Sequence, residues 1–78
     1  MGNIKSHFKV EGLVQGVGFR YFVYKVAVGL NLKGYAKNCT DGSVEVMVEG
    51  EETAIDKLHN KLKRGPSRSN VTDVTITK

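Results

Sequence analysis

The stretch Val14-Gln15-Gly16-Val17-Gly18-Phe19-Arg20 decides how the rest of the chain is interpreted. It lies between an alternating run, Phe8 to Leu13, typical of a strand, and an apolar-periodic run, Tyr21 to Leu30, typical of a helix. Two glycines so close together allow the left-handed conformation that turns backbone N–H groups inward. The first N–H groups of the following helix have no intrahelical partner. A Gly-rich loop that leads into a helix N-terminus therefore predicts an anion site.

Arg20 strengthens the prediction of an anion site. A cation in the first turn of a helix lies at the positive end of the helix dipole, where it is unfavourable. Local rules broken in this way often mark functional sites. An anion bound by both the loop amides and the guanidinium would remove the conflict, and we expect this anion to be a phosphate group. Tyr21 replaces the third glycine of a dinucleotide-binding loop and no Walker motif follows, so neither common nucleotide loop is present.

Length and composition describe one small domain. Its 78 residues leave room for one core and no second lobe. The net charge of +4 suits an acidic small molecule but falls short of the dense basic stripe of a duplex-binding protein. There is no apolar run long enough for a membrane span or a signal peptide, and the single cysteine, Cys39, cannot form an internal disulfide. We therefore expect a cytoplasmic monomer whose partners include neither a nucleic acid nor a membrane.

The first half of the chain predicts a strand, a helix and a second strand. Residues 1–5 are expected to form a disordered tail. In Phe8 to Leu13 apolar and polar side chains alternate, as in a half-buried strand. Asn31 is expected to end the helix, because Asn tolerates the left-handed conformation there, and Leu32 to Asn38 predicts the second strand. The apolar stripe of the helix is assigned to Phe22, Val23, Val26, Ala27 and Leu30.

The second half predicts a hairpin, a second helix and a last strand. Asp41-Gly42 is typical of a hairpin turn. Ser43 to Glu49 is the clearest strand, with its alternating valines directed inward, and Gly50 is expected to break it. Gly65-Pro66 is expected to end the second helix, and Val71 to Thr77 predicts the last strand. The apolar stripe of the second helix is assigned to Ala54, Ile55, Leu58 and Leu62.

The element order βαββαβ indicates an α+β fold. Two crossovers around one hairpin give the ferredoxin-like sandwich, an antiparallel sheet with both helices on one face. The first and second strands then run parallel with the third between them, so their carboxyl ends share one edge. One end carries the Gly-rich loop and Arg20, and the other carries Asn38, roughly 10 Å or two strand spacings away. The topology therefore predicts that Asn38 lies near the anion site.

Most of the chain, from Phe8 to Ile76, resembles the acylphosphatase family. The resemblance implies a single acylphosphatase-like domain over residues 1–78. Members of that family usually continue past Ile76 into a fifth strand, so we expect that strand to be missing here. The residues that match the family are the loop Val14 to Arg20, then Leu30, Leu32, Gly34, Tyr35 and Asn38, then Asp41, Gly42, Val44, Glu45 and Gly50.

The resemblance implies an enzyme that hydrolyses the carboxyl–phosphate bond of small acyl phosphates without a metal ion or cofactor. The loop amides of residues 15–20 and the guanidinium of Arg20 would hold the phosphate, and Asn38 would position the attacking water. A carboxylate with a pKa of about 4 departs without a general acid. Electrostatics and positioning then supply most of the catalysis. Asn cannot act as a base, so we expect the proton of the water to go to the substrate phosphate.

Other interpretations remain open at this stage. The same fold could serve as a catalytically inactive domain that binds an anion or has a regulatory role. The two glycines alone fit a plain tight turn. Arg20 also fits a surface ion pair, and Asn38 also fits a simple turn residue. Turnover of an acyl phosphate, against phosphate binding alone, separates the enzyme from the inactive domain.

Two further functions are disfavoured by the residue types. Cys39 as a nucleophile would need an activating base, and nothing in the sequence places His7 or His59 beside it. Both histidines are expected at the surface, since no spacing typical of metal ligands appears. RNA-recognition modules share the βαββαβ order but carry stacking aromatics on the third strand. This chain has instead, on the outward face of that strand, Glu45, Met47 and Glu49.

Overall fold

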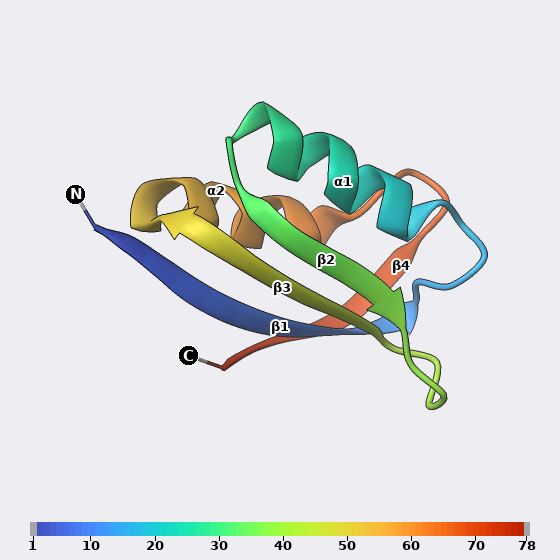
Figure 1. Ribbon diagram of the computed structural model, residues 1–78. Helices are drawn as coiled ribbons and strands as arrows, with labels where there is room; N and C mark the ends of the chain where they lie inside the picture. Colours follow the sequence, from blue (N-terminus) through green and yellow to red (C-terminus); the bar gives the residue numbers. More distant parts are fainter. Residues whose placement is uncertain (1, 78) are drawn as a thin grey trace.

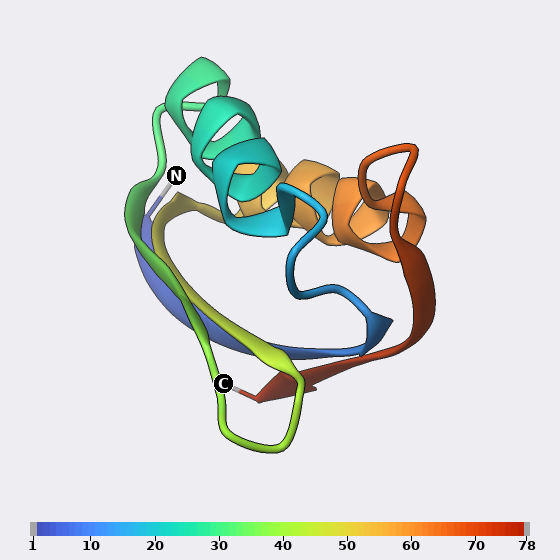
Figure 2. The same ribbon diagram turned by 90° about the vertical axis from the view of Figure 1, so that its right-hand side faces the viewer.

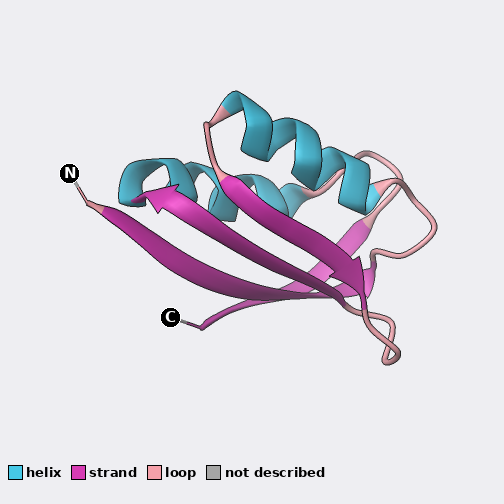
Figure 3. Cartoon of the chain, viewed as in Figure 1, coloured by secondary structure: helices cyan, strands magenta, loops and turns pink. Residues whose placement is uncertain are grey.

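Two helices cover one face of a four-stranded antiparallel sheet (Figure 1, Figure 3). The structure is a computed structural model and describes residues 2–77. Its elements follow in the order βαββαβ, which confirms the predicted ferredoxin-like α+β fold. The elements are β1 (Asn3–Leu13), α1 (Phe19–Gly29), β2 (Lys33–Asn38), β3 (Val44–Glu51), α2 (Glu52–Arg64) and β4 (Asn70–Thr77).

The sheet has the strand order β2-β3-β1-β4. Each neighbouring pair is antiparallel, so β1 and β2 run parallel to each other with β3 between them, as predicted. β2 and β4 are the two edges, and residues 2–77 form no fifth strand. Within the same residues, neither helix is both long and apolar enough to span a bilayer.

The core lies between the sheet and the two helices (Figure 2). The inward faces of the two central strands supply its floor, because side chains on a strand alternate between faces. α2 contributes the stripe predicted from its periodicity, although Ala54 is only half-buried. The most buried apolar side chains of these three elements are Phe8 and Val10 from β1, Val44, Val46 and Val48 from β3, and Ile55, Leu58 and Leu62 from α2.

The prediction of a disordered tail is wrong for residues 3–5, since β1 begins at Asn3. The first three residues of β1 pair with the last three residues of β3. Those ladder partners come from a distant part of the chain, so the local alternation gave no sign of them. β3 correspondingly continues through Gly50, which was expected to break it; a Cβ there would collide with the side chain of Leu32. The prediction for Met1 lies outside the described residues.

The buried face of α1 overlaps the predicted stripe and adds Phe19 to it. Phe19 and Val23 are buried, whereas Val26 and Leu30 are only half-buried. The reason is that the helix begins two residues earlier than predicted, so that Phe19 and Val23 form the i, i+4 pair facing the sheet. Asn31 does follow the helix in the left-handed conformation, with φ of 59°, as predicted.

Candidate active site

The carboxyl ends of β1 and β2 lie at the same end of the sheet (Figure 1). β1 leads into the loop of residues 14–18, and β2 ends at Asn38. β3 lies between the two strands and sets their separation at roughly 10 Å, two strand spacings. The structure therefore places the loop and Asn38 at the same end of the sheet, as the topology predicted.

Both glycines of the loop adopt the left-handed conformation. The φ angle is 75° at Gly16 and 79° at Gly18, which is the N-cap residue of α1. A Cβ built on either glycine meets no atom within 4 Å, so the requirement for glycine comes from the backbone conformation and not from crowding. Val14 and Phe19, which flank the turn, are 1% and 2% exposed and fix it to the core.

The turn leaves its backbone N–H groups unpaired within the protein. The first bond of α1 runs from Phe22 N to Gly18 O, at 3.0 Å. Among the hydrogen bonds within residues 2–77, none has a donor N–H from residues 16–20. These donors lie at the positive end of α1, so the loop offers a partial positive charge and amide protons to an anion.

Arg20 adds a full positive charge to the same end of the helix. Its side chain is exposed, and it forms no ion pair with any residue in the 2–77 range. The first turn of α1 contains no acidic residue that could offset it. Arg20 also lines a groove between α1 and β2. Arg20 and the unpaired loop amides thus lie at the same end of α1.

Gln15 fastens the loop to the β2–β3 connection. Its Nε2 donates to the carbonyl of Cys39 at 2.8 Å and to the carbonyl of Ser43 at 2.9 Å. Cys39 directly follows Asn38, so these two bonds fix the loop relative to the end of β2. The sequence placed Gln15 in the loop but did not reveal this role, because both acceptors lie more than twenty residues away along the chain.

The β2–β3 turn is held by its own network of polar contacts. Asp41 Oδ1 accepts from the N–H of Ser43 at 3.0 Å and from its hydroxyl at 2.6 Å, and Lys9 Nζ lies 3.0 Å from Asp41 Oδ2. The Ser43 hydroxyl is the largest cause that lowers the pKa of Asp41 below its ordinary value, followed by the Ser43 N–H and Lys9. The carboxylate therefore stays ionised, and the turn after Asn38 keeps its shape.

The two histidines lie apart from the loop. His7, on the open face of the sheet, bonds to Glu45, and this bond is the main cause that lowers the pKa of Glu45. His59 is half-buried, with its ring 5.1 Å from that of Phe8, and burial lowers its pKa. His59 is thus less exposed than predicted. Within residues 2–77 no hydrogen bond joins either histidine to Cys39, so neither is placed as its activating base.

A family model, curated relatives and two solved structures name one family. The acylphosphatase family model matches residues 6–78. The acylphosphatase of Pasteurella multocida is 49% identical, over 91% of this chain and 79% of its own. The crystal structure of the acylphosphatase from Bacillus subtilis superposes with a TM-score of 0.91 at 44% identity, covering 94% of this chain and 81% of that one. An acylphosphatase structure from Coxiella burnetii gives 0.92 at 39% identity, with coverages of 96% and 79%. The chain therefore belongs to the acylphosphatase family.

Proposed function

We propose that the chain hydrolyses the carboxyl–phosphate bond of small acyl phosphates, releasing a carboxylate and inorganic phosphate. Membership of the family makes the chain a hydrolase. The proposal of this reaction rests mainly on the unpaired amides of the loop, which lie beside Arg20. They lie at the end of the sheet where β2 finishes at Asn38. In this reading the backbone amides of residues 15–20 and the guanidinium form one anion site.

Arg20 and the loop bind the phosphoryl group. A guanidinium donates two parallel hydrogen bonds to two phosphate oxygens, which a lysine ammonium cannot do. Charge spreads over the equatorial oxygens of the phosphoryl group as it is transferred. Fixed amide donors aimed at those oxygens stabilise this charge without having to reorganise.

Asn38 positions the attacking water. Its side-chain carbonyl accepts a hydrogen bond from the water and its amide donates one, but it has no basic group to take a proton. The proton of the water therefore passes to an oxygen of the substrate phosphate as the oxygen–phosphorus bond forms. The carboxylate leaves unprotonated, because a group with a pKa of about 4 needs no acid to depart. The reaction so described requires neither a metal ion nor a cofactor.

The proposed setting is a cytoplasmic monomer that acts on a small molecule. The support is the single thiol, Cys39, which has no internal cysteine partner. Neither a nucleic acid nor a membrane is needed for the proposed reaction. The outward side chains of β3 include two acids, Glu45 and Glu49, which would repel a nucleic-acid backbone.

The direct test compares turnover with phosphate binding. Hydrolysis of benzoyl phosphate is followed for the wild type, for Arg20→Ala, and for Arg68→Ala as a control that removes an exposed arginine outside residues 14–20. Binding of inorganic phosphate is measured by calorimetry on the same proteins. We expect turnover in the wild type and in the control only. Phosphate binding without turnover in the wild type would instead assign the chain as a catalytically inactive anion-binding or regulatory domain.

A further inference from the structure

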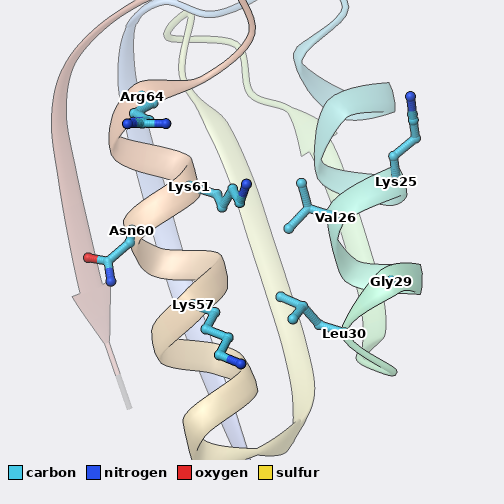
Figure 4. Close-up of a pocket in the computed structure, with 8 residues that line it drawn as sticks. All are labelled: Lys25, Val26, Gly29, Leu30, Lys57, Asn60, Lys61 and Arg64. Atoms are coloured by element: carbon cyan, nitrogen blue, oxygen red, sulfur yellow. The ribbon is translucent and has the colours of Figure 1, made fainter.

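A groove between the two helices lies outside the proposed active site. It has a volume of about 580 Å³, and the sheet lies behind it in Figure 4. None of its lining residues belongs to the loop of residues 14–20, and Asn38 is not among them. The lining residues are Lys25, Val26, Gly29 and Leu30 from α1 and Lys57, Asn60, Lys61 and Arg64 from α2.

Every charged residue that lines this interhelical groove is a cation. Lys57, Lys61 and Arg64 recur at i, i+4 and i+7 on α2, and α1 carries no acidic residue at all. None of the four cations forms an ion pair within the part of the chain described, residues 2–77. The dipole of α2 favours Lys61 and Arg64 in its last turn, but it does not account for Lys57 in mid-helix. Lys25, on α1, lies over the ring of Tyr21, 5.6 Å from its centroid.

The opposite wall of the interhelical groove is apolar. Val26 and Leu30 point from α1 toward α2, while Lys57 and Lys61 point back toward α1 (Figure 4). Both apolar side chains are half-buried, because the sheet-facing side of α1 is taken by Phe19 and Val23. Gly29 has no side chain, and a Cβ there would meet no atom within 4 Å, which leaves room beside Leu30. The groove thus pairs an apolar wall with a basic one.

We propose that the interhelical groove binds an acidic amphipathic helix of a partner protein. Such a helix lays its apolar ridge between two helices of its receptor. Acidic residues repeating at i and i+4 along its flank would match Lys57, Lys61 and Arg64, which extend over about 10 Å of α2 at 1.5 Å per residue. Charge complementarity favours an acidic partner, because every charged residue that lines the groove is a cation.

Other occupants fit the interhelical groove less well. A small ligand is usually enclosed over most of its surface, whereas this groove is open to solvent between the helices. A bilayer needs protruding apolar side chains, but Val26 and Leu30 are half-buried and face Lys57 and Lys61 across the groove. Single-stranded nucleic acid stacks on aromatic rings, and none lines the groove.

The test uses a fluorescent peptide of about 18 residues, long enough for substantial helicity, with a leucine stripe flanked by glutamates. Its affinity for the full chain is measured by anisotropy at low and high salt, and amide NMR shifts locate it. Lys57→Glu/Lys61→Glu is compared with Lys63→Glu/Arg68→Glu, a control pair of exposed cations outside the groove with the same charge change. A second peptide with the leucines replaced by glutamine measures the apolar contribution.

We expect the groove variant to bind the peptide at least about tenfold more weakly than the wild type, while the control pair changes affinity far less. The shifted amides should be those of Val26, Gly29 and Leu30, and benzoyl phosphate turnover should stay unchanged in both variants. Absence of peptide binding, equal loss in both variants, or equal binding of the leucine-free peptide would overturn the proposal. Binding to anionic phosphatidylglycerol vesicles, with no binding to the peptide, would overturn it as well.

Discussion

At the scale of single residues, Arg20 and Asn38 are expected to have separable roles. Arg20→Ala removes a bidentate donor from the phosphate, so both phosphate affinity and turnover should fall, turnover by at least about 10²–10³-fold. Asn38→Ala removes the group that orients water, so kcat should fall while phosphate affinity stays near that of the wild type. Steady-state kinetics and phosphate calorimetry on both variants check this division. An equal loss of phosphate binding in the two variants would contradict it.

Gln15 is a positioning residue at the same scale. Its amide is the donor to two backbone carbonyls, of Cys39 and Ser43, and Ser43 is 2% exposed. Gln15→Leu should destabilise the protein by about 1–3 kcal/mol, because two hydrogen bonds are lost. Both carbonyls keep a backbone donor, Ser43 from the N–H of Cys39 and Cys39 from the N–H of Gly42. It should also lower kcat more than it raises KM, because the loop is no longer fixed relative to Asn38. Urea denaturation and kinetics are the measurements; a stability loss with unchanged kcat would reduce Gln15 to a structural role.

At the scale of elements, the turn into α1 depends on two left-handed glycines. Gly18→Ala forces a Cβ into a conformation that costs about 1–2 kcal/mol, and it reorients the amides that face the anion. Stability and phosphate affinity should therefore fall together. Gly29→Ala, at the end of the same helix, is the matched control, because nothing lies within 4 Å of its Cβ and Ala is the better helix former. If Gly18→Ala behaved like Gly29→Ala, the turn would not need its special conformation.

At the scale of the whole molecule, the small core sets the stability. A chain of 78 residues is expected to have a free energy of unfolding of about 4–12 kcal/mol. Leu58 is 0% exposed, so Leu58→Ala should lower the free energy of unfolding by about 2–5 kcal/mol. Leu13→Ala, at a position 59% exposed, should change stability by no more than about 0.5 kcal/mol. Urea denaturation of both variants tests whether burial decides the difference.

Acid is expected to destabilise the whole molecule. Hydrogen bonds lower the pKa of Asp41 and of Glu45, so each stabilises the fold above its unfolded pKa of about 4 and loses this as the pH falls. Burial lowers the pKa of His59, so protonation of this ring also destabilises the fold as the pH falls below its unfolded pKa of about 6.5. The melting temperature should therefore decrease from neutral to acidic pH. Asp41→Asn should show a shallower decrease than the wild type; parallel curves would argue against the turn network as a cause.

Much of the fold was predictable because its signals are local. Alternation marked the valines of β3, the helical period marked Ile55, Leu58 and Leu62, and Asn31 ended α1 as expected. What the sequence missed depends on partners far along the chain. The pairing of Asn3 with Glu51 and the bonds of Gln15 are of this kind. The parallel course of β1 and β2 predicted that the loop and Asn38 lie at the same end of the sheet. The anion-binding role of Arg20 was predicted from its place in the first turn of the helix, and the role of Asn38 was inferred from a family resemblance; both remain predictions.

The position of β2 at the edge of the sheet has a consequence for how copies of the protein meet. Its outer backbone groups are unpaired, and such an edge invites a strand from another molecule. Lys33 and Lys37 are both exposed on this strand, and two copies brought together edge to edge would crowd four ammonium groups. We therefore expect these two lysines to disfavour such pairing, and their neutralisation to favour association between copies.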